Sequence, residues 1–147
     1  EKNEKEMIKI NNYSKIATAG AEMTYGADNF RRLITNEVID IVMPDVKFCG
    51  GPTEVINLEK SIQDPSQKIS MHCPSGPISL LTSAHITSSI SSKLPLEHAV
   101  KEVPWRHEVL LPNEKIINGE MHLPKENGIG ATLNPEIIHN KGKIWQE

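Results

Sequence analysis

The sequence predicts an α/β fold in which short parallel strands alternate with helices, and two observations support this. Short apolar runs rich in β-branched residues alternate with longer runs whose apolar residues recur at helical spacing. In addition, one polar residue able to do chemistry stands at or just past the end of each short run, at intervals of 23, 27 and 25 residues. Each interval suits one strand and one helix, so we expect a parallel sheet with right-handed crossovers.

Four strands are expected. The first has the sequence IATAGA and is bounded by small residues, which is typical of a buried strand. The second, IDIVM, stops at Pro44, and the fourth contains Pro95, which weakens its assignment. The expected strands cover residues 16–21, 39–43, 68–72 and 94–97.

Helices are expected before the first strand and after each of the first three strands. Asp28 is a suitable N-cap for the second helix, because Phe30, Leu33 and Ile34 follow it at helical spacing. Pro52 is well placed in the first turn of the next helix. The expected helices cover residues 1–12, 28–38, 52–62 and 78–90.

From residue 104 onward, the pattern changes to proline, glycine and isolated apolar residues. Asn118-Gly119 and Asn127-Gly128 are turn signals in this stretch, and Asn-Gly is a strong hairpin signal. We therefore expect two parts: strand-helix units over residues 1–103 and an extended, hairpin-containing tail over residues 104–147.

The composition argues against several classes of protein. With 16 Lys and Arg against 19 Asp and Glu, the net charge is −3, which does not suit a nucleic-acid binder that works by bulk electrostatics. No apolar run approaches the roughly 20 residues of a membrane span, and the first residues, EKNEKEMIKI, lack the apolar region of a signal peptide. Two cysteines cannot form a disulfide scaffold, so we expect a protein of the cytoplasm.

The candidate functional residues stand at the four strand ends: Glu22, Asp45, His72 and Glu97. In a (β/α)₈ barrel the active site lies at the C-terminal ends of the strands, so these side chains would surround one mouth. Each also has a simpler structural interpretation. Glu22 suits a rim residue or helix cap, Asp45 suits a turn, and His72 suits a loop histidine.

Four segments carry a family resemblance: IATAGAEMTYG, IVMPDVKFCGGPTE, ISMHCPSGPIS and LPLEHAV. Together with the closing VPWRHEVLLPNEKIINGEMHLPKENGIGATLN, they resemble the C-terminal barrel half of the enolase superfamily, in its mandelate racemase-like branch. Within that branch they are most similar to acid-sugar dehydratases of the galactonate type. The resemblance implies the C-terminal half of a (β/α)₇β TIM-type barrel. Residues 1–103 would then supply its fifth to eighth strands, and residues 104–147 a tail packed on the barrel or on a capping domain absent from this chain.

The resemblance also implies a role for each candidate. Glu22 would be the third carboxylate ligand of a catalytic Mg²⁺. Asp45 and His72 would form a dyad that takes or gives a proton at the carbon beside the substrate carboxylate. Glu97 would hydrogen-bond that carboxylate as it becomes an enediolate. The sequence Gly20-Ala21-Glu22 departs from the family's usual Gly-Glu or Gly-Gly-Glu, but alanine is small enough to preserve the function.

General chemistry supports this set of residue types. Removing a proton beside a carboxylate places a second negative charge on the same group, and a divalent cation offsets that charge. A lysine or histidine base acting with Mg²⁺ is a pattern already known for this superfamily. A buried aspartate fixes the histidine tautomer and leaves the other ring nitrogen for substrate. Loss of the β-hydroxyl then yields a 2-keto-3-deoxy acid, with the leaving group protonated either by His72 or by a residue outside this chain.

Other residues have weaker claims. His85 is interpreted as a packing or surface residue and Cys73 as a small wall residue. Gly50-Gly51 suits a tight turn better than an anion site, although it precedes a helix. Ser75 and Trp105 are candidates for substrate contact at the rim. The remaining histidines have no companion at metal-ligand spacing and are assigned to the surface: His98, His107, His122 and His139.

We expect the chain to work with partners, namely a small sugar-acid substrate and the missing N-terminal half of the same enzyme, and to be a homo-oligomer when complete. No nucleic acid or membrane partner is expected. Three functions stay open: an Mg²⁺-dependent sugar-acid dehydratase, a racemase, epimerase or cycloisomerase using the same proton abstraction, and a truncated non-catalytic half-barrel that serves as an interaction module. A half-barrel leaves strand edges unpaired, so we expect the isolated 147 residues to be inactive.

Overall fold

A computed structural model describes residues 3–142 of the chain. The ends of the two expected parts, residues 1–2 and 143–147, lie outside the described residues. The first part contains α1 (Glu4–Tyr13), β1 (Ala19–Gly20), α2 (Ala27–Thr35), β2 (Ile41–Val42), α3 (Pro52–Glu59), β3 (Lys68–Ile69) and α4 (Pro77–Ser89). The second contains a 3₁₀ turn (Arg106–Glu108), β4 (Leu110–Leu111), β5 (Ile116–Ile117), β6 (Glu120–Met121), β7 (Thr132–Leu133) and α5 (Pro135–Lys141).

The strands β1, β2 and β3 form a parallel sheet in that order, with Ala19 opposite Ile41 and Ile41 opposite Lys68. Single backbone hydrogen bonds continue the pairing past the strand ends. His72 N–H donates to the Pro44 carbonyl over 3.1 Å, which ties the chain after β3 to the chain after β2. The expected α/β fold with parallel strands is confirmed.

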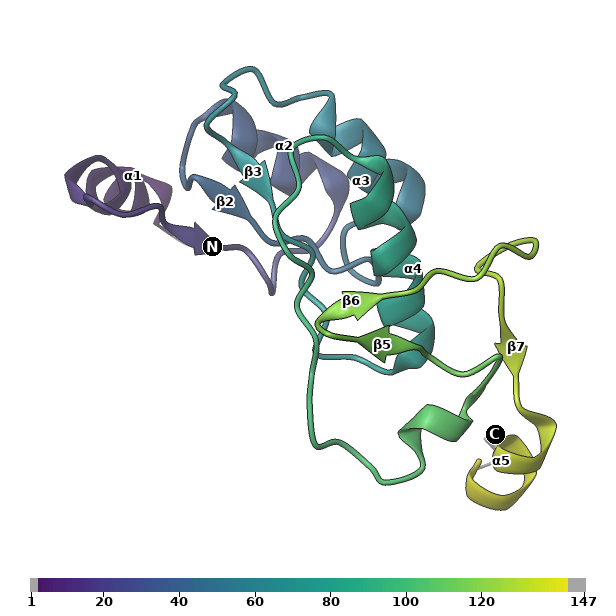
Figure 1. Cartoon of the computed structure of the whole chain (residues 1–147). Coiled ribbons are helices and arrows are strands. Elements are labelled where there is room, and N and C mark those ends of the chain that lie inside the picture. The colour runs from purple at the N-terminus through teal and green to yellow at the C-terminus, as the bar shows by residue number, and fades with distance from the viewer. Residues whose placement is uncertain (1–2, 143–147) are drawn as a thin grey trace, which may run out of the picture.

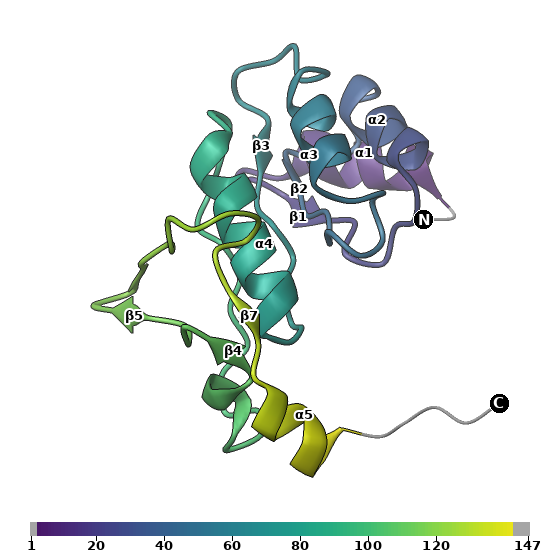
Figure 2. The same ribbon diagram turned by 90° about the vertical axis from the view of Figure 1, so that its right-hand side faces the viewer.

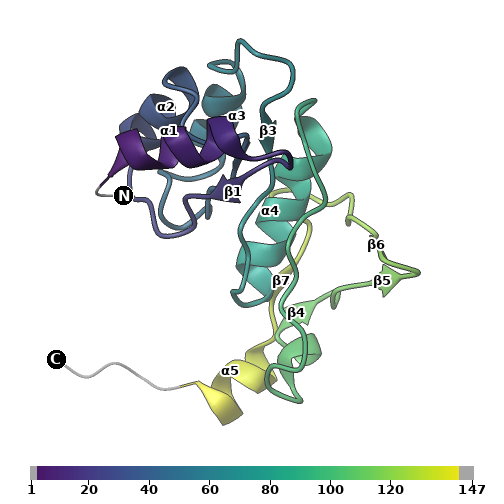
Figure 3. The same cartoon turned by 90° about the vertical axis from the view of Figure 1, so that its left-hand side faces the viewer.

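Helices α2, α3 and α4 follow one another along one side of this sheet (Figure 1). They and the strands enclose one cluster of buried apolar side chains, among which Phe30, Leu58 and Ile69 are almost fully buried. The helix α1 lies at the β1 edge, and its Glu4 carboxylate pairs with Arg32 of α2 over 2.8 Å (Figure 3). The core thus fixes the sheet from which the candidate residues project.

Several expected element ends are wrong in detail. The first strand is limited to Ala19–Gly20, and Ile16 is exposed rather than buried, because no neighbouring strand or helix covers it among the described residues. The second helix begins at Ala27 with Gly26 at its N-cap, so Asp28 lies in the first turn and caps nothing. The segment expected as a fourth strand, residues 94–97, is not a regular strand. An isolated parallel bridge joins the preceding Lys93 to Ile69, and the Leu94 and Glu97 N–H groups donate to the Ile69 and Met71 carbonyls over 2.8 and 3.2 Å.

The tail runs beside α4 and away from α1 in both turned views (Figures 2 and 3). Its expected hairpin is formed by β5 and β6, with Asn118 and Gly119 both at positive φ, as the tight Asn-Gly turn requires. Asn127-Gly128 forms a turn before β7, as expected, in which the Gly130 N–H donates to the Asn127 carbonyl over 3.2 Å. The strand β7 pairs with β4. The helix α5 was not expected, although Asn134 caps it through the Glu136 N–H and Pro135 opens it.

Within residues 3–142, none of the helices has both the length and the apolar character needed to cross a membrane. The boundary expected between residues 103 and 104 stays a prediction.

Candidate active site

Asp45 and His72 become neighbours because they follow adjacent parallel strands. After β2 the chain turns sharply at Asp45, whose carbonyl accepts from Phe48 N–H and Cys49 N–H, both over 2.9 Å. The Asp45 Oδ1 atom accepts from the Lys47 N–H over 2.9 Å, so the carboxylate is held by its own turn. The bond from His72 N–H to Pro44 then sets His72 beside this turn.

The two side chains face each other. His72 Nδ1 lies 3.4 Å from Asp45 Oδ2, and the exposed fractions of the two side chains are 13% and 1%. Neither atom has a hydrogen-bond partner of good geometry among the described residues. A buried carboxylate oxygen and a buried imidazole nitrogen that each lack a hydrogen bond are complementary, so a small rotation would close a hydrogen bond between them.

Glu97 approaches the imidazole from its other side. Its Oε2 lies 3.7 Å from His72 Nε2 and accepts the Cys73 N–H over 3.0 Å. The Glu97 side chain is 40% exposed, in contrast to Asp45. The imidazole therefore lies between a buried carboxylate at Nδ1 and a half-exposed carboxylate at Nε2, and only the second side is open to a ligand.

Glu22 lies just past the end of β1 and is half-buried. Within residues 3–142, it is not part of a group of three His, Cys, Asp or Glu side chains that could hold a metal ion. Its carboxylate folds back over Gly20, where an added Cβ would lie 3.9 Å from Oε2. The preceding Ala21 has φ of 85°, in the left-handed region where glycine is favoured. The departure from the family's glycine therefore falls at a position with strained backbone.

Sequence reasoning missed Lys47 and Arg106 as residues of this region. Lys47 Nζ lies 3.5 Å from Asp45 Oδ2 and donates a hydrogen bond to Ser75 Oγ. Arg106 of the tail donates to the Ser75 carbonyl over 3.2 Å. Lysine two residues after an aspartate, or arginine in a tail, is an ordinary sequence feature, so nothing in the pattern distinguished them.

Both cysteines are buried thiols. Burial raises the pKa of Cys73 above its usual value of 9.0, despite a backbone hydrogen bond involving Ser75 that acts in the opposite direction. Burial likewise raises the pKa of Cys49. A thiol with a raised pKa is a poor nucleophile at neutral pH, which agrees with the interpretation of Cys73 as a wall residue.

The remaining candidates are spread over the surface and the turns. His85 Nε2 lies 3.0 Å from the Ile129 carbonyl, so it links α4 to the tail. Gly50 and Gly51 both have positive φ, as expected for a tight turn. Trp105 is half-buried at the start of the 3₁₀ turn.

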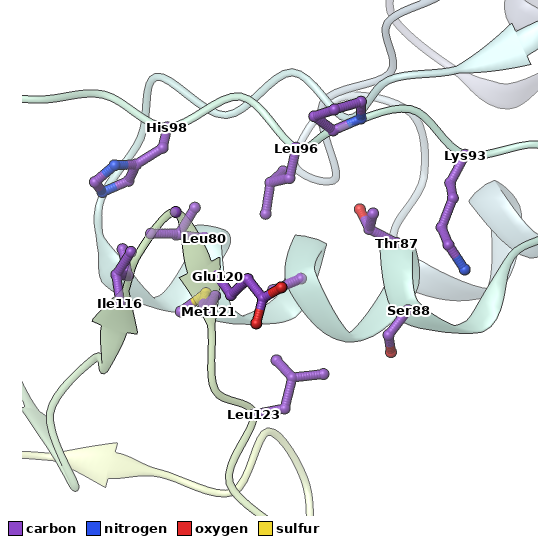
Figure 4. A pocket seen from close by; sticks show the side chains of 13 residues that line it. Leu80, Thr87, Ser88, Lys93, Leu96, His98, Ile116, Glu120, Met121 and Leu123 are labelled. Atoms are coloured by element: carbon purple, nitrogen blue, oxygen red, sulfur yellow. The ribbon is translucent and has the colours of Figure 1, made fainter.

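A cavity of about 790 Å³ lies away from the dyad. It lies between α4, residues 93–98 and the β5–β6 hairpin, with Leu96, Met121 and Leu123 around it (Figure 4). Its lining is mostly apolar, and none of the four candidate residues contributes to it. The candidate site is therefore the open rim at the strand ends and not this cavity.

Comparison with known proteins identifies the class of protein. The family model described as "Enolase C-terminal domain-like" matches residues 1–137, and the chain belongs to this family. A member of the enolase superfamily from Salmonella Typhimurium has a TM-score of 0.84 and 24% identity, covering 95% of this chain and 36% of that one. The 3,6-anhydro-D-galactonate cycloisomerase from Zobellia galactanivorans has a TM-score of 0.80 and 23% identity, covering 93% and 39%. The fold is thus that of the enolase superfamily's barrel enzymes, represented here by a partial barrel.

Among curated relatives, the D-xylonate dehydratase of Haloferax volcanii is 28% identical over 120 residues, covering 82% of this chain and 29% of the relative. The D-galactonate dehydratase of Pectobacterium atrosepticum is 22% identical over 131 residues, covering 85% of this chain and 34% of the relative. The chain therefore spans about a third of the length of the curated relatives it matches. The expected resemblance to acid-sugar dehydratases of the enolase superfamily is confirmed.

Proposed function

We propose that the chain carries the dyad-bearing part of an Mg²⁺-dependent lyase that dehydrates a sugar acid of the aldonate type to a 2-keto-3-deoxy acid. The observation that carries this proposal is the pairing of buried Asp45 Oδ2 with His72 Nδ1 at 3.4 Å. The dehydratase names of the curated relatives support the reaction class.

His72 acts as the base. When Asp45 accepts a hydrogen bond from Nδ1–H, the lone pair of the neutral imidazole is on Nε2, at the face that is open toward Glu97. Nε2 takes the proton from the carbon next to the substrate carboxylate, and the electron pair of that C–H bond moves into the carboxylate, forming an enediolate. Asp45 stabilises the resulting imidazolium without itself accepting the proton.

Glu97 acts at the substrate carboxylate. Its Oε2 is already fixed by the Cys73 N–H and lies 3.7 Å from His72 Nε2, a separation that suits a shared substrate group. In its protonated form Glu97 donates a hydrogen bond to the enediolate as charge develops there. The carboxylate C=O then re-forms, and the electron pair of the enediolate C=C bond becomes a π bond between the α- and β-carbons. The bond from the β-carbon to its hydroxyl breaks, and the hydroxyl leaves as water with a proton from the His72 imidazolium or from a residue outside this chain. The enol product tautomerises to the 2-keto-3-deoxy acid.

Glu22 would supply one oxygen ligand to the Mg²⁺. The half-buried carboxylate at a strand end is the ligand type that Mg²⁺ prefers, but residues 3–142 hold no group of three potential metal ligands. Mg²⁺ when bound stabilises negative charge on the substrate carboxylate. The other protein ligands must come from outside the described residues, so the isolated chain is expected to bind Mg²⁺ weakly.

Two alternatives to dehydration stay open. Racemisation, epimerisation and cycloisomerisation begin with the same proton transfer, but the dehydratases among the curated relatives favour elimination over these reactions. The other alternative is a non-catalytic half-barrel that serves as an interaction module. The orientation of Asp45 toward His72 favours catalysis over the module, because an interaction module has no need for a buried carboxylate facing an imidazole.

The test is to assay the complete protein on a panel of sugar acids with Mg²⁺, measuring 2-keto-3-deoxy product. Wild type should form this product from at least one acid. His72→Asn should lower kcat by a factor of about 10² to 10⁴. His122→Asn is the matched control, because His122 is exposed and distant in sequence from the dyad. Isomerised product without dehydration would support a racemase or cycloisomerase, and absence of turnover with every acid would contradict the proposal.

A further inference from the structure

The dyad aspartate has a lysine ammonium beside it as well as the His72 imidazole. Lys47 Nζ lies 3.5 Å from Asp45 Oδ2, the same oxygen that faces His72 Nδ1 at 3.4 Å. The Lys47 backbone N–H meanwhile donates to the other oxygen, Oδ1, over 2.9 Å. One residue therefore contacts both oxygens of the buried carboxylate, one through its backbone and one through its side chain.

The Lys47 side chain is held in this position by two further contacts. Its ammonium donates to Ser75 Oγ, on the loop that follows His72, and lies 4.8 Å from the centre of the Phe48 ring. Lys47 thus joins the turn after β2, which carries the aspartate, to the loop after β3, which carries the histidine.

Ser75 is fixed from the opposite side by the tail. Arg106 donates to the Ser75 carbonyl over 3.2 Å, and its guanidinium is paired with Glu102 and Glu114. The Arg106 and Glu114 side chains are largely buried. A continuous set of polar contacts therefore runs from Asp45 through Lys47 and Ser75 to the tail.

We propose that Lys47 is a positioning residue of the dyad, which acts through Asp45 and Ser75 and does not touch the substrate. Two requirements of the site lead to this role. A buried carboxylate needs compensation of its charge, which Lys47 provides while His72 is neutral. The separation between Asp45 and His72 depends on two loops, and Lys47 ties those loops together. The expected changes in kcat and KM rest on the proposed function, because they require turnover of a sugar acid.

An ordinary surface ion pair is the alternative, since the Lys47 side chain is 42% exposed and exposed pairs contribute little. The two interpretations differ in their consequences. A surface pair affects neither turnover nor the imidazole, whereas a positioning residue affects turnover much more than substrate binding.

The experiment compares Lys47→Met, Lys47→Arg and Lys60→Met in the complete protein. Lys60 is the matched control, because it is an exposed lysine whose ammonium contacts only Asn57 Oδ1, over 3.4 Å, within the described residues. Lys47→Met should lower kcat by about tenfold or more, because small displacements of catalytic groups are costly, while KM changes less than about twofold. Lys47→Arg keeps a cation near Asp45 and should retain most of the turnover, and Lys60→Met should match wild type.

A second readout does not require turnover. In ¹⁵N NMR of the complete protein, the Nδ1 resonance of His72 should move in Lys47→Met and stay in place in Lys60→Met. Unchanged kcat and an unchanged Nδ1 resonance in Lys47→Met would overturn the role of Lys47. A wild-type protein inactive on every sugar acid, but with the Nδ1 resonance displaced in Lys47→Met, would contradict the proposed function and leave the positioning contact supported.

Discussion

The two parts of the chain differ in the interactions that hold each of them in place. In residues 3–103, strands and helices share one apolar cluster whose fully buried members lie between Ala21 and Ile90. In residues 104–142, Leu110 and Ile137 are the buried apolar side chains, and neither belongs to that cluster. The tail also makes polar contacts with the first part, such as that of Arg106 with Ser75. The main apolar cluster thus fixes the positions of the strand ends, and the tail contributes polar contacts beside them.

Core truncation should show the largest difference in stability between the two parts. Leu58 is 0% exposed in the cluster, and Leu133 of β7 is 46% exposed. Leu58→Ala should lower the free energy of unfolding by about 2–5 kcal/mol, because it removes buried area and leaves a cavity. Leu133→Ala should cost less than about 1 kcal/mol. Urea unfolding of the complete protein, followed by circular dichroism, measures both. Equal losses would show that the tail belongs to the same cooperative core.

A smaller effect should arise at the strand-to-helix turns of the first part. Gly51 precedes α3 with φ of 93° and ψ of −176°, and Gly76 precedes α4 with φ of −63°. An added Cβ would meet open space at both positions. Gly51→Ala should therefore cost about 1–3 kcal/mol through backbone strain alone.

Gly76→Ala provides the control for this change, because its backbone is accessible to any residue and both glycines are helix N-caps. The expected cost is within about 0.5 kcal/mol in the same unfolding experiment. A cost for Gly51→Ala no greater than that for Gly76→Ala would mean that the Gly50-Gly51 turn relaxes and does not constrain the chain after Asp45.

The same contrast explains how much could be predicted from sequence. Apolar spacing predicted the helices that bury Phe30 and Leu58, and the order of polar residues at strand ends predicted that Asp45 and His72 would be neighbours. Ile16 was expected to be buried because an apolar run says nothing about which neighbour covers it. The helix α5 was missed, although Asn134 and Pro135 formed a recognisable start, because the surrounding prolines and glycines favoured an extended tail.

The polar contacts of Ser75 could not be predicted, because they depend on side chains distant in sequence. Lys47 reaches Ser75 across 28 positions, and Arg106 reaches it across 31. Such pairs leave no periodic pattern, unlike a strand or a helix face. The positions of Glu22 and Glu97 at strand ends could be predicted, but their roles as metal ligand and carboxylate partner stay predictions.

The pairing of Asp45 with His72 is tested most directly by the tautomer of the imidazole. Long-range ¹H–¹⁵N NMR of the complete protein, at a pH where His72 is neutral, distinguishes a protonated Nδ1 from a protonated Nε2. We predict the Nδ1–H tautomer in wild type, with its loss or weakening in Asp45→Asn, because the amide can offer its NH₂ group in place of the second carboxylate oxygen. An Nε2–H tautomer in wild type, or a tautomer that Asp45→Asn leaves unchanged, would contradict the dyad.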